Sequence, residues 1–411
     1  MSHVWLKIGK GVLVVLIVGF VVLSKAGPGG TWTVCPAGPP TCQFKSIQEA
    51  LAAASDGDTI LVRAGIYREN LVITQSRITL RGEEPPGTVR LEAAEPFHAI
   101  EIGPSSVGVT IEGFTVRGAG RGQFAEFAGI FVVGAGALLQ RNIFQDNNVG
   151  IWVTNPVKEP VVQVLENTFT GNDKDIEVSS RALIQGNRFD DEVSVDIGGY
   201  AEIRKNQGAI LRINGAALVE ENRFMQVKVF SFSISPPTVL RRNQIVGTGQ
   251  NPGEGSFEEG LIIKAGSPLT VEDNLISQHG VSAIVIDRSN AGILLQRNTI
   301  TNSGYGLWLL EGFPQLVRVE GNTIERNRLG GVLLISADEE AQFEVVNNLI
   351  RLNQGNGIMV GIAGRYVFQG NRILDNDHWG VVATIPPCAQ EDLGLRPQVT
   401  GSGNEIANNG K

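Results

Sequence analysis

Residues 138–144 read LLQRNIF, and this short unit returns along most of the chain. It consists of alternating apolar residues, a polar pair, an asparagine, and a phenylalanine or isoleucine two residues later. It reappears, for example, as VLENTF at 164–169 and as LLQRNTI at 294–300. The asparagines follow one another at an average interval of about 24 residues, which is the period of a solenoid repeat. Asn206 lies in the weakest copy. The asparagine column comprises Asn142, Asn167, Asn187, Asn206, Asn222, Asn243, Asn274, Asn298, Asn322, Asn348, Asn371 and Asn404.

A second short strand follows most of these asparagines and usually opens with glycine, as in GIWVT at 150–154 and GLWLL at 306–310. Apolar residues alternate with period two in these strands, and no helical periodicity lies between them. Parallel strands that stack coil upon coil, about 4.8 Å apart, satisfy this pattern. We therefore predict an all-β fold for residues 27–411. The expected architecture is a single-stranded right-handed parallel β-helix of about 12–14 coils.

The asparagine column is predicted to be structural and not catalytic. A sharp corner between strands needs a residue that tolerates left-handed backbone angles, and asparagine or glycine does so. Stacked asparagine side chains can also hydrogen-bond from coil to coil. Gly82 and Gly113 are expected to take the same corner place in two earlier coils.

The N-terminal end of the solenoid is predicted to carry a capping helix. A solenoid end exposes apolar core and unpaired strands unless something covers it. Residues 44–54 (FKSIQEALAAA) have the pattern of a short amphipathic helix, with Ser46 and Glu49 placed as a capping box.

The first 26 residues predict export from the cytoplasm. Lys7 and Lys10 precede an apolar run at 11–23, which fits the hydrophobic core of a signal peptide. Cleavage before Gly27 is expected, and an uncleaved membrane anchor over residues 1–26 is the alternative. Either outcome places the protein outside the cytoplasm, either free or anchored.

The three cysteines fit this compartment. Cys35 and Cys42 bracket the turn-rich segment PAGPPT, and in an exported chain such a pair predicts a disulfide. Cys388 is left without a predicted partner. The formal net charge of −8 repels phosphate, so binding to nucleic acid or to anionic lipid through a basic patch is not expected.

Residues 44–73 (FKSIQEALAAASDGDTILVRAGIYRENLVI) resemble the opening of the pectin-lyase-like β-helix superfamily. The closest resemblance is to its NosD-like branch of carbohydrate-binding and sugar-hydrolase repeats, and it extends to the C-terminus. Gly65, Tyr67 and Glu69 match residues that are structural in the pectin methylesterases of this superfamily. The resemblance implies the β-helix fold and a carbohydrate partner. It does not imply one activity, because the fold hosts lyases, hydrolases, esterases, epimerases and adhesins.

The catalytic signatures of these enzymes are incomplete in the sequence. Gln145-Asp146 resembles the catalytic pair of pectin methylesterases, but their partner segments are missing. Asp190-Asp191 and His279-Gly280 are fragments of the polygalacturonase set and lie several coils apart. NosD resemblance would imply copper, yet the histidines show no ligand spacing, so we expect neither a metal nor a cofactor. The histidines are His3, His98, His279 and His378.

The outward-facing side chains of the second strands define a candidate site. In GIWVT, Ile151 and Val153 point inward and Trp152 points outward. Two insertions, 118–127 and 247–259, precede the coils of Phe131 and Ile262, and longer loops tend to carry function. A shift of two residues in the alignment of the short middle coils would leave the same side chains pointing outward. It would change which of them are neighbours along the column. The predicted outward column is Phe131, Trp152, Glu177, Asp196, Arg212, Lys228, Ile262, Val285, Trp308, Leu333, Met359 and Val382.

Two functions fit this column. In the first, a binding protein holds a polysaccharide or another cell-envelope polymer through Trp152, Arg212 and Lys228, because an aromatic ring beside polar groups suits a sugar. In the second, Glu177 and Asp196 are the paired carboxylates of a glycoside hydrolase, about 5 Å apart if it is a retaining one, or the face belongs to a lyase. The incomplete signatures favour the binding protein.

Two other interpretations of the column remain open. The ionic stretch is an ordinary solvated surface if Asp196 and Arg212 form only a weak surface ion pair. Alternatively Trp308, flanked by Leu333 and Met359, belongs to a separate contact surface.

Overall fold

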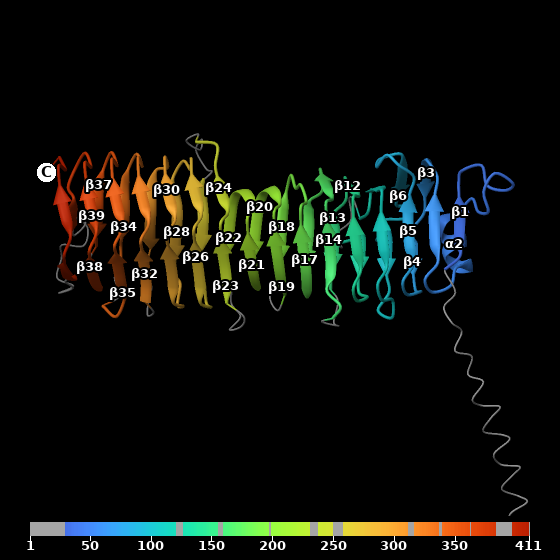
Figure 1. Ribbon diagram of the computed structural model, residues 1–411, viewed down its shortest axis with the longest axis horizontal. Coiled ribbons are helices and arrows are strands. Elements are labelled where there is room, and N and C mark those ends of the chain that lie inside the picture. The colour runs from blue at the N-terminus through green and yellow to red at the C-terminus, as the bar shows by residue number, and fades with distance from the viewer. Residues whose placement is uncertain are drawn as a thin grey trace, which may run out of the picture.

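The computed structural model describes residues 29–120, 126–154, 159–196, 199–230, 237–249, 258–310, 316–336, 339–361, 363–383 and 397–410. They form a long rod of stacked coils, and the chain advances from one end to the other (Figure 1). Every pairing between strands is parallel, as the predicted β-helix requires. Each coil pairs in register with the next coil along the rod, as in Phe131↔Trp152 and Trp152↔Glu177.

The first face is a 16-stranded sheet, so the rod has more coils than the 12–14 that the asparagine repeat indicated. The twelve asparagines and the two earlier glycine corners account for 14 of these strands, and the first two strands of the chain carry neither signal. The strands of this face are β1 (Thr31–Val34), β2 (Thr59–Val62), β5 (Thr79–Gly82), β8 (Thr110–Glu112), β11 (Leu138–Gln140), β14 (Val162–Leu165), β17 (Arg181–Gln185), β19 (Tyr200–Arg204), β21 (Ala216–Glu220), β23 (Thr238–Arg241), β26 (Leu269–Glu272), β29 (Ile293–Gln296), β32 (Leu316–Glu320), β35 (Gln342–Val346), β38 (Arg365–Gln369) and β41 (Gln398–Ser402).

The second face follows the asparagine corner. Its strands are β3 (Gly65–Arg68), β6 (Val89–Glu92), β9 (Phe114–Arg117), β12 (Ile143–Gln145), β15 (Thr168–Thr170), β24 (Gln244–Val246), β27 (Leu275–Ser277), β30 (Thr299–Thr301), β33 (Thr323–Glu325), β36 (Leu349–Arg351), β39 (Arg372–Leu374) and β42 (Glu405–Ala407).

The third face carries the predicted outward column. Its strands are β4 (Leu71–Ile73), β7 (Ile100–Ile102), β10 (Ala128–Val132), β13 (Val149–Val153), β16 (Lys174–Val178), β18 (Glu192–Val195), β20 (Gln207–Ile213), β22 (Arg223–Val229), β25 (Glu259–Ile263), β28 (Ser282–Asp287), β31 (Tyr305–Leu310), β34 (Gly330–Leu334), β37 (Asn356–Val360) and β40 (Val381–Ala383).

The core is a continuous column of aliphatic and aromatic side chains inside the rod. In β13, Ile151 and Val153 are fully buried, whereas Trp152 between them faces outward, as the period-two pattern predicted. Phe144, Phe169 and Phe189 stack along the inside of the asparagine corner, with ring centroids 4.9 and 5.0 Å apart. Because each coil buries its apolar side chains only against neighbouring coils, stability accumulates along the rod.

The asparagine column forms an unbroken ladder, which confirms its predicted structural role. Each side-chain amide donates to the amide oxygen of the next asparagine, at 2.9–3.2 Å, from Asn142 to Asn404 and including the weak match Asn206. The same amide also donates to a backbone carbonyl of the preceding coil, as Asn298 does to Val271 at 2.9 Å. Buried amides that are satisfied in this way fix the coils in register.

The prediction that the asparagine itself takes the left-handed backbone conformation at the corner was wrong. The residue before the asparagine has positive φ, as in Arg141 (53°), Glu166 (55°) and Arg297 (53°). Gly113 (φ 83°) aligns with Arg141, one position before the column, so it replaces the turning residue and not the asparagine. Gly82 aligns with Gly113 but has no positive φ. The turn and the ladder are therefore carried by adjacent residues.

A second ladder, which the sequence analysis missed, lies five residues after the first. Asn147 donates to Asn172 at 3.0 Å, and a later series runs from Asn327 through Asn353 and Asn376 to Asn409. Between these two series, β20 and β22 run through the corner as continuous seven-residue strands. The middle coils are short because they omit this corner.

Buried titratable side chains stand at both ends of the gap in the second ladder. Asp175 accepts hydrogen bonds from the side chain of Asn172 at 3.0 Å and from the backbone of Asp190 and Asp191 at 3.0 and 2.9 Å. His279 begins the later series: its Nε2 lies 3.2 Å from the carbonyl of Ile245. His279 therefore has a structural role in place of a ladder asparagine, which explains the isolated His-Gly pair.

The capping helix is α2 (Ile47–Ala53), inside the predicted 44–54 segment. The hydroxyl of Ser46 accepts a hydrogen bond from the backbone of Glu49, which is half of the predicted capping box. Glu69 provides the rest: its carboxylate accepts from the Ser46 hydroxyl at 2.6 Å and from the backbone of Ile47 and Gln48 at 3.0 and 2.9 Å. A residue of the following coil thus ties the cap to the rod.

The predicted disulfide between Cys35 and Cys42 is present, with an S–S distance of 2.00 Å. Residues 1–26 and Cys388 lie outside the described residues, so export and the state of Cys388 stay predictions. Among the described helices, none has the length and apolar character to cross a membrane.

Candidate functional site

The outward column of the third face exists, with one correction in its middle. Trp152 pairs with Glu177, which pairs with Ser194, which in turn pairs with Arg212 and then Lys228. Asp196 was predicted at the Ser194 position and lies two residues further on, just after β18. The sequence EVSVD alternates equally well in either register, so its periodicity could not decide between them.

An aromatic cluster occupies the N-terminal part of the column. Phe131 and Trp152 lie on adjacent coils with ring centroids 5.1 Å apart. His98 stacks flat on Phe131 at 4.3 Å, and Phe127 contacts His98 edge-on at 5.2 Å. We call these four residues the aromatic platform. His98 and Phe127 were not predicted, because neither belongs to the repeat.

His98 is neutral in this environment. Burial lowers the pKa of His98 to about 4. Its Nδ1 accepts a hydrogen bond from the backbone of Ala128 at 2.9 Å, which requires that nitrogen to be unprotonated. The platform is therefore an uncharged, half-buried apolar surface at neutral pH.

Glu177 adjoins the platform one coil further along the rod. It is only 7% exposed, and Lys174 lies 3.0 Å from its carboxylate. Lys174 also contacts Glu126, at 3.1 Å, so the short segment before β10 supplies both Glu126 and Phe127 to the site. This segment includes the end of the predicted insertion 118–127, whose residues 121–125 lie outside the described residues.

Burial raises the pKa of Glu177, Lys174 opposes that rise, and Asp196 adds to it. Asp196 lies close enough to Glu177 to raise its pKa, so the structure brings the two predicted carboxylates near each other despite the register correction. Asp196 accepts hydrogen bonds from Ser179 at 3.1 Å and from Ser194 at 3.2 Å.

The two predicted cations differ in their surroundings. Arg212 forms an ion pair with Glu192 at 2.9 Å, and its guanidinium lies 5.4 Å from the ring centroid of Phe230. The predicted pair with Asp196 is replaced by this contact. Lys228 forms no ion pair with any described residue. Burial raises the pKa of Glu259, and the charge of Lys228 opposes that rise.

The C-terminal part of the column is apolar, as predicted. Val285 and Leu333 are each only 5% exposed although they face outward. Trp308 is half-buried and lies beside Tyr305, with ring centroids 5.7 Å apart. The described part of the insertion 247–259 ends at Gly249 and resumes at Glu258, so its contribution to this face stays a prediction.

The remaining sequence fragments do not join the site. Asp146 lies in the corner after β12, where it pairs with Arg117 at 3.5 Å, and it does not face the column. Among the described residues, no group of three or more histidine, cysteine or acidic side chains is placed to hold a metal ion. Two surface depressions lie away from the column, one on the first face and one on the outside of the short coils.

Comparison with known proteins agrees with this architecture. The sequence profile of the right-handed beta helix region matches residues 98–317, which is more than half of the chain. The protein belongs to this family, which also confirms the predicted handedness. No curated protein sequence matches the chain.

Several solved structures are similar to this chain at low identity. The Azotobacter vinelandii mannuronan C-5 epimerase AlgE6 A-module is 13% identical, with 88% of this chain and 93% of that chain covered and a TM-score of 0.37. The periplasmic alginate epimerase AlgG is 14% identical, with 86% and 72% covered and a TM-score of 0.41. The catalytic domain of a GH87 α-1,3-glucanase in complex with tetrasaccharides is 14% identical, with 93% and 70% covered and a TM-score of 0.41. Likeness at this level concerns the fold alone.

Proposed function

We propose that the protein is an exported binder of a polysaccharide, and that the polymer lies along the third face between Trp152 and Lys228. The observation that carries the proposal is the register pairing of Trp152, in the aromatic platform, with Glu177 on the next coil. Sugars present apolar C–H faces and hydroxyl edges, and a half-buried ring beside hydrogen-bonding carboxyls matches both. The resemblance of the opening segment to the NosD-like, carbohydrate-binding branch supports the same partner.

The linear arrangement of the column suits a polymer. Trp152, Glu177, Arg212 and Lys228 stand on successive or nearly successive coils, and coils are about 4.8 Å apart. The groups from Trp152 to Lys228 therefore extend for about 19 Å along the rod. A ligand must be several sugar units long to contact all of them.

The incomplete catalytic signatures favour binding over hydrolysis. A retaining glycosidase holds its two carboxyl groups about 5–5.5 Å apart, and an inverting one holds them about 6.5–9.5 Å apart. Asp196 lies close enough to Glu177 to raise its pKa, so one requirement of a glycosidase, a pair of neighbouring carboxyl groups, is met. The sequence carries no complete catalytic set of the superfamily beside this pair.

Hydrolysis is the second candidate because of one observation. Burial raises the pKa of Glu177, which is the direction of shift that a general acid needs. In a hydrolase, Asp196 would be the nucleophile or base.

The test is a glycan array and a set of soluble polysaccharides presented to the purified full-length chain, scored for binding and for release of reducing ends. We expect binding without release. Glu177→Gln and Asp196→Asn should then keep measurable binding, because the amides retain hydrogen-bonding capacity. Release of reducing ends that either substitution abolishes while binding persists would establish the hydrolase. Absence of binding to every polysaccharide would reject the proposal.

Export is part of the proposal and is supported by the Cys35–Cys42 disulfide, since such bonds persist in oxidising compartments. A reporter fused after Lys411 should appear outside the cytoplasm. A cytoplasmic product that retains Met1 would contradict export without affecting the binding test.

A further inference from the structure

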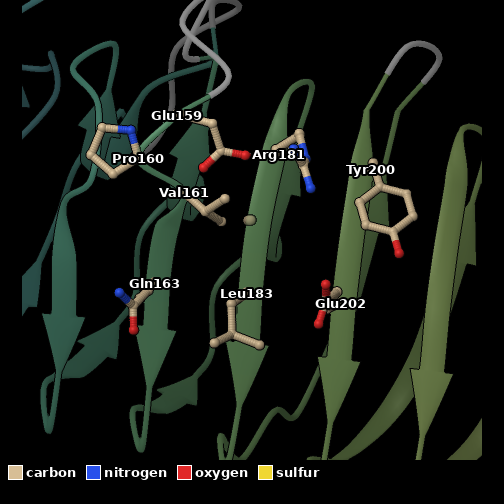
Figure 2. A pocket seen from close by; sticks show the side chains of 9 residues that line it. Glu159, Pro160, Val161, Gln163, Arg181, Leu183, Tyr200 and Glu202 are labelled. Atoms are coloured by element: carbon tan, nitrogen blue, oxygen red, sulfur yellow. Dashed lines mark hydrogen bonds and ion pairs between the residues drawn. The ribbon is translucent and has the colours of Figure 1, made fainter.

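A depression on the first face lies apart from the third-face column. It is formed by β14, β17, β19 and the residues just before β14, and has a volume of about 320 Å³. Figure 2 shows its side chains rising from neighbouring strands, with Pro160 and Glu159 at one end and Tyr200 at the other. Leu183 and Val161 form the apolar part between them. Ligand pockets range from about 300 to 1,000 Å³, so this one accommodates a single small ring.

The charges that border the depression are already compensated. Arg181 pairs with Glu159 at 2.6 Å, and its guanidinium lies 5.6 Å from the ring centroid of Tyr200. Glu202 pairs with Arg204 at 2.6 Å. A charged ligand would have to break one of these pairs, whereas a neutral ligand would not. The ion pairs also hold Arg181 against the ring and so fix one wall of the depression.

Two neutral polar groups at the depression remain available. Neither the hydroxyl of Tyr200 nor the side-chain amide of Gln163 has a hydrogen-bond partner among the described residues. Burial raises the pKa of Tyr200, and Glu202 adds to the rise, so the phenol stays protonated and can donate. A hydroxyl donor and an amide at the edge of an apolar floor are groups that recognise a polyol ring.

We propose that this depression is a second ligand site, which binds one neutral sugar ring between Pro160 and Tyr200. The ring contacts Leu183 and Tyr200 with its C–H groups, and its hydroxyls bond to Gln163 and to the Tyr200 hydroxyl. The site lies on a different face from Trp152 and does not depend on the proposed polysaccharide site. A glycan anchored at both places would gain affinity through the shared attachment to one rod.

Saturation-transfer NMR on the full-length protein tests the site. The probes are the methyl glycosides of glucose, galactose and mannose, with glucuronate as a charged comparison. In the Trp152→Ala background, which weakens sugar binding on the third face, we expect transfer to at least one neutral glycoside that falls at least about fivefold when Tyr200→Ala is added. Transfer that persists in Tyr200→Ala, transfer to glucuronate alone, or no transfer to any neutral glycoside would overturn the proposal.

A second measurement uses the unsubstituted protein, so it does not depend on how well Tyr200→Ala folds. Hydroxyl-radical footprinting reports the oxidation of Tyr200 relative to Tyr305, which is half-buried on the third face and corrects for radical scavenging by the sugar. A lowered Tyr200/Tyr305 ratio in the presence of the methyl glycoside supports the site. An unchanged ratio at saturating glycoside overturns it.

Discussion

Trp152 and Glu177 are register partners on neighbouring coils, and both project from the same outward column of the third face. Trp152 is the last ring of the aromatic platform, and Glu177 is the first buried carboxyl of the ionic stretch. The aromatic platform and the carboxyl group of Glu177 therefore lie on neighbouring coils, so an apolar surface is followed directly by a hydrogen-bonding group. A ligand that lies along the rod at this step contacts both.

The asparagine ladder should determine stability and not binding. Asn298→Ala removes the side-chain hydrogen bonds to the carbonyl of Val271 and to Asn322. It also removes the oxygen that accepts from the backbone and side chain of Asn274, so buried polar groups on the preceding coil lose their partners. We expect a loss of about 1–3 kcal/mol in the free energy of unfolding, measured by denaturant titration, with unchanged ligand affinity. Asn290→Ala is the matched control, because Asn290 is exposed, and it should change stability by less than about 0.5 kcal/mol. A selective loss of binding in folded Asn298→Ala would contradict the structural assignment.

Asp175 should make the protein less stable as the pH rises through the mildly acidic range. Burial raises the pKa of Asp175 from 3.8 to about 6, so the folded protein binds this proton more tightly than the unfolded chain does. Its contribution to stability is complete below pH 3.8 and is lost as the pH rises through about 6, a change on the order of 3 kcal/mol. Asp175→Asn resembles the protonated form and should lack this change. Melting temperatures of the two proteins that run parallel from pH 4 to pH 7 would refute the shift.

His98 should have the opposite effect from Asp175: it should make the protein less stable as the pH falls through the acidic range. Burial lowers the pKa of His98 from 6.5 to about 4, so the folded protein binds this proton less tightly than the unfolded chain. The stability it contributes is present above pH 6.5 and is lost as the pH falls through about 4. His98→Gln keeps a hydrogen-bond acceptor for the Ala128 backbone and removes the titration. The melting temperature of the unsubstituted protein should fall relative to this variant on acidification, and a constant difference would show that His98 is solvated.

The fold could be predicted because its signal is repeated in nearly every coil. Residue type and the two-residue period of the strands predict the asparagine column, the two alternating strands of each repeat and the outward orientation of Trp152. The left-handed residue before each asparagine could not be found in this way. It is Arg, Glu, Lys, Asp, Asn or Gly in different coils, and the Arg, Glu and Lys side chains carry no preference for that conformation.

Only those parts of the candidate site that belong to the repeat could be predicted from the sequence. Glu177 and the facing of the column follow from the repeat, but the choice between Ser194 and Asp196 does not, because a two-residue slip preserves the alternation. His98 and Phe127 reach the platform from a turn and from an insertion, where the sequence has no period. The proximity of Glu177 and Asp196 depends on where the two side chains lie between neighbouring coils. The distance between their carboxyl groups cannot be derived from a single sequence.

The most direct test of the central claim is the dissociation constant for the best polysaccharide from the binding screen, measured by calorimetry on Trp152→Ala and Trp308→Ala. Both are outward-facing tryptophans of the same column, on coils well separated along the rod, so each controls for the other. If the polymer lies on the aromatic platform, Trp152→Ala should weaken binding by about 1–3 kcal/mol, or roughly 5- to 150-fold, and Trp308→Ala should leave it unchanged. If Trp308→Ala abolishes binding and Trp152→Ala has no effect, the polymer binds the apolar C-terminal part of the column and the proposed site is wrong.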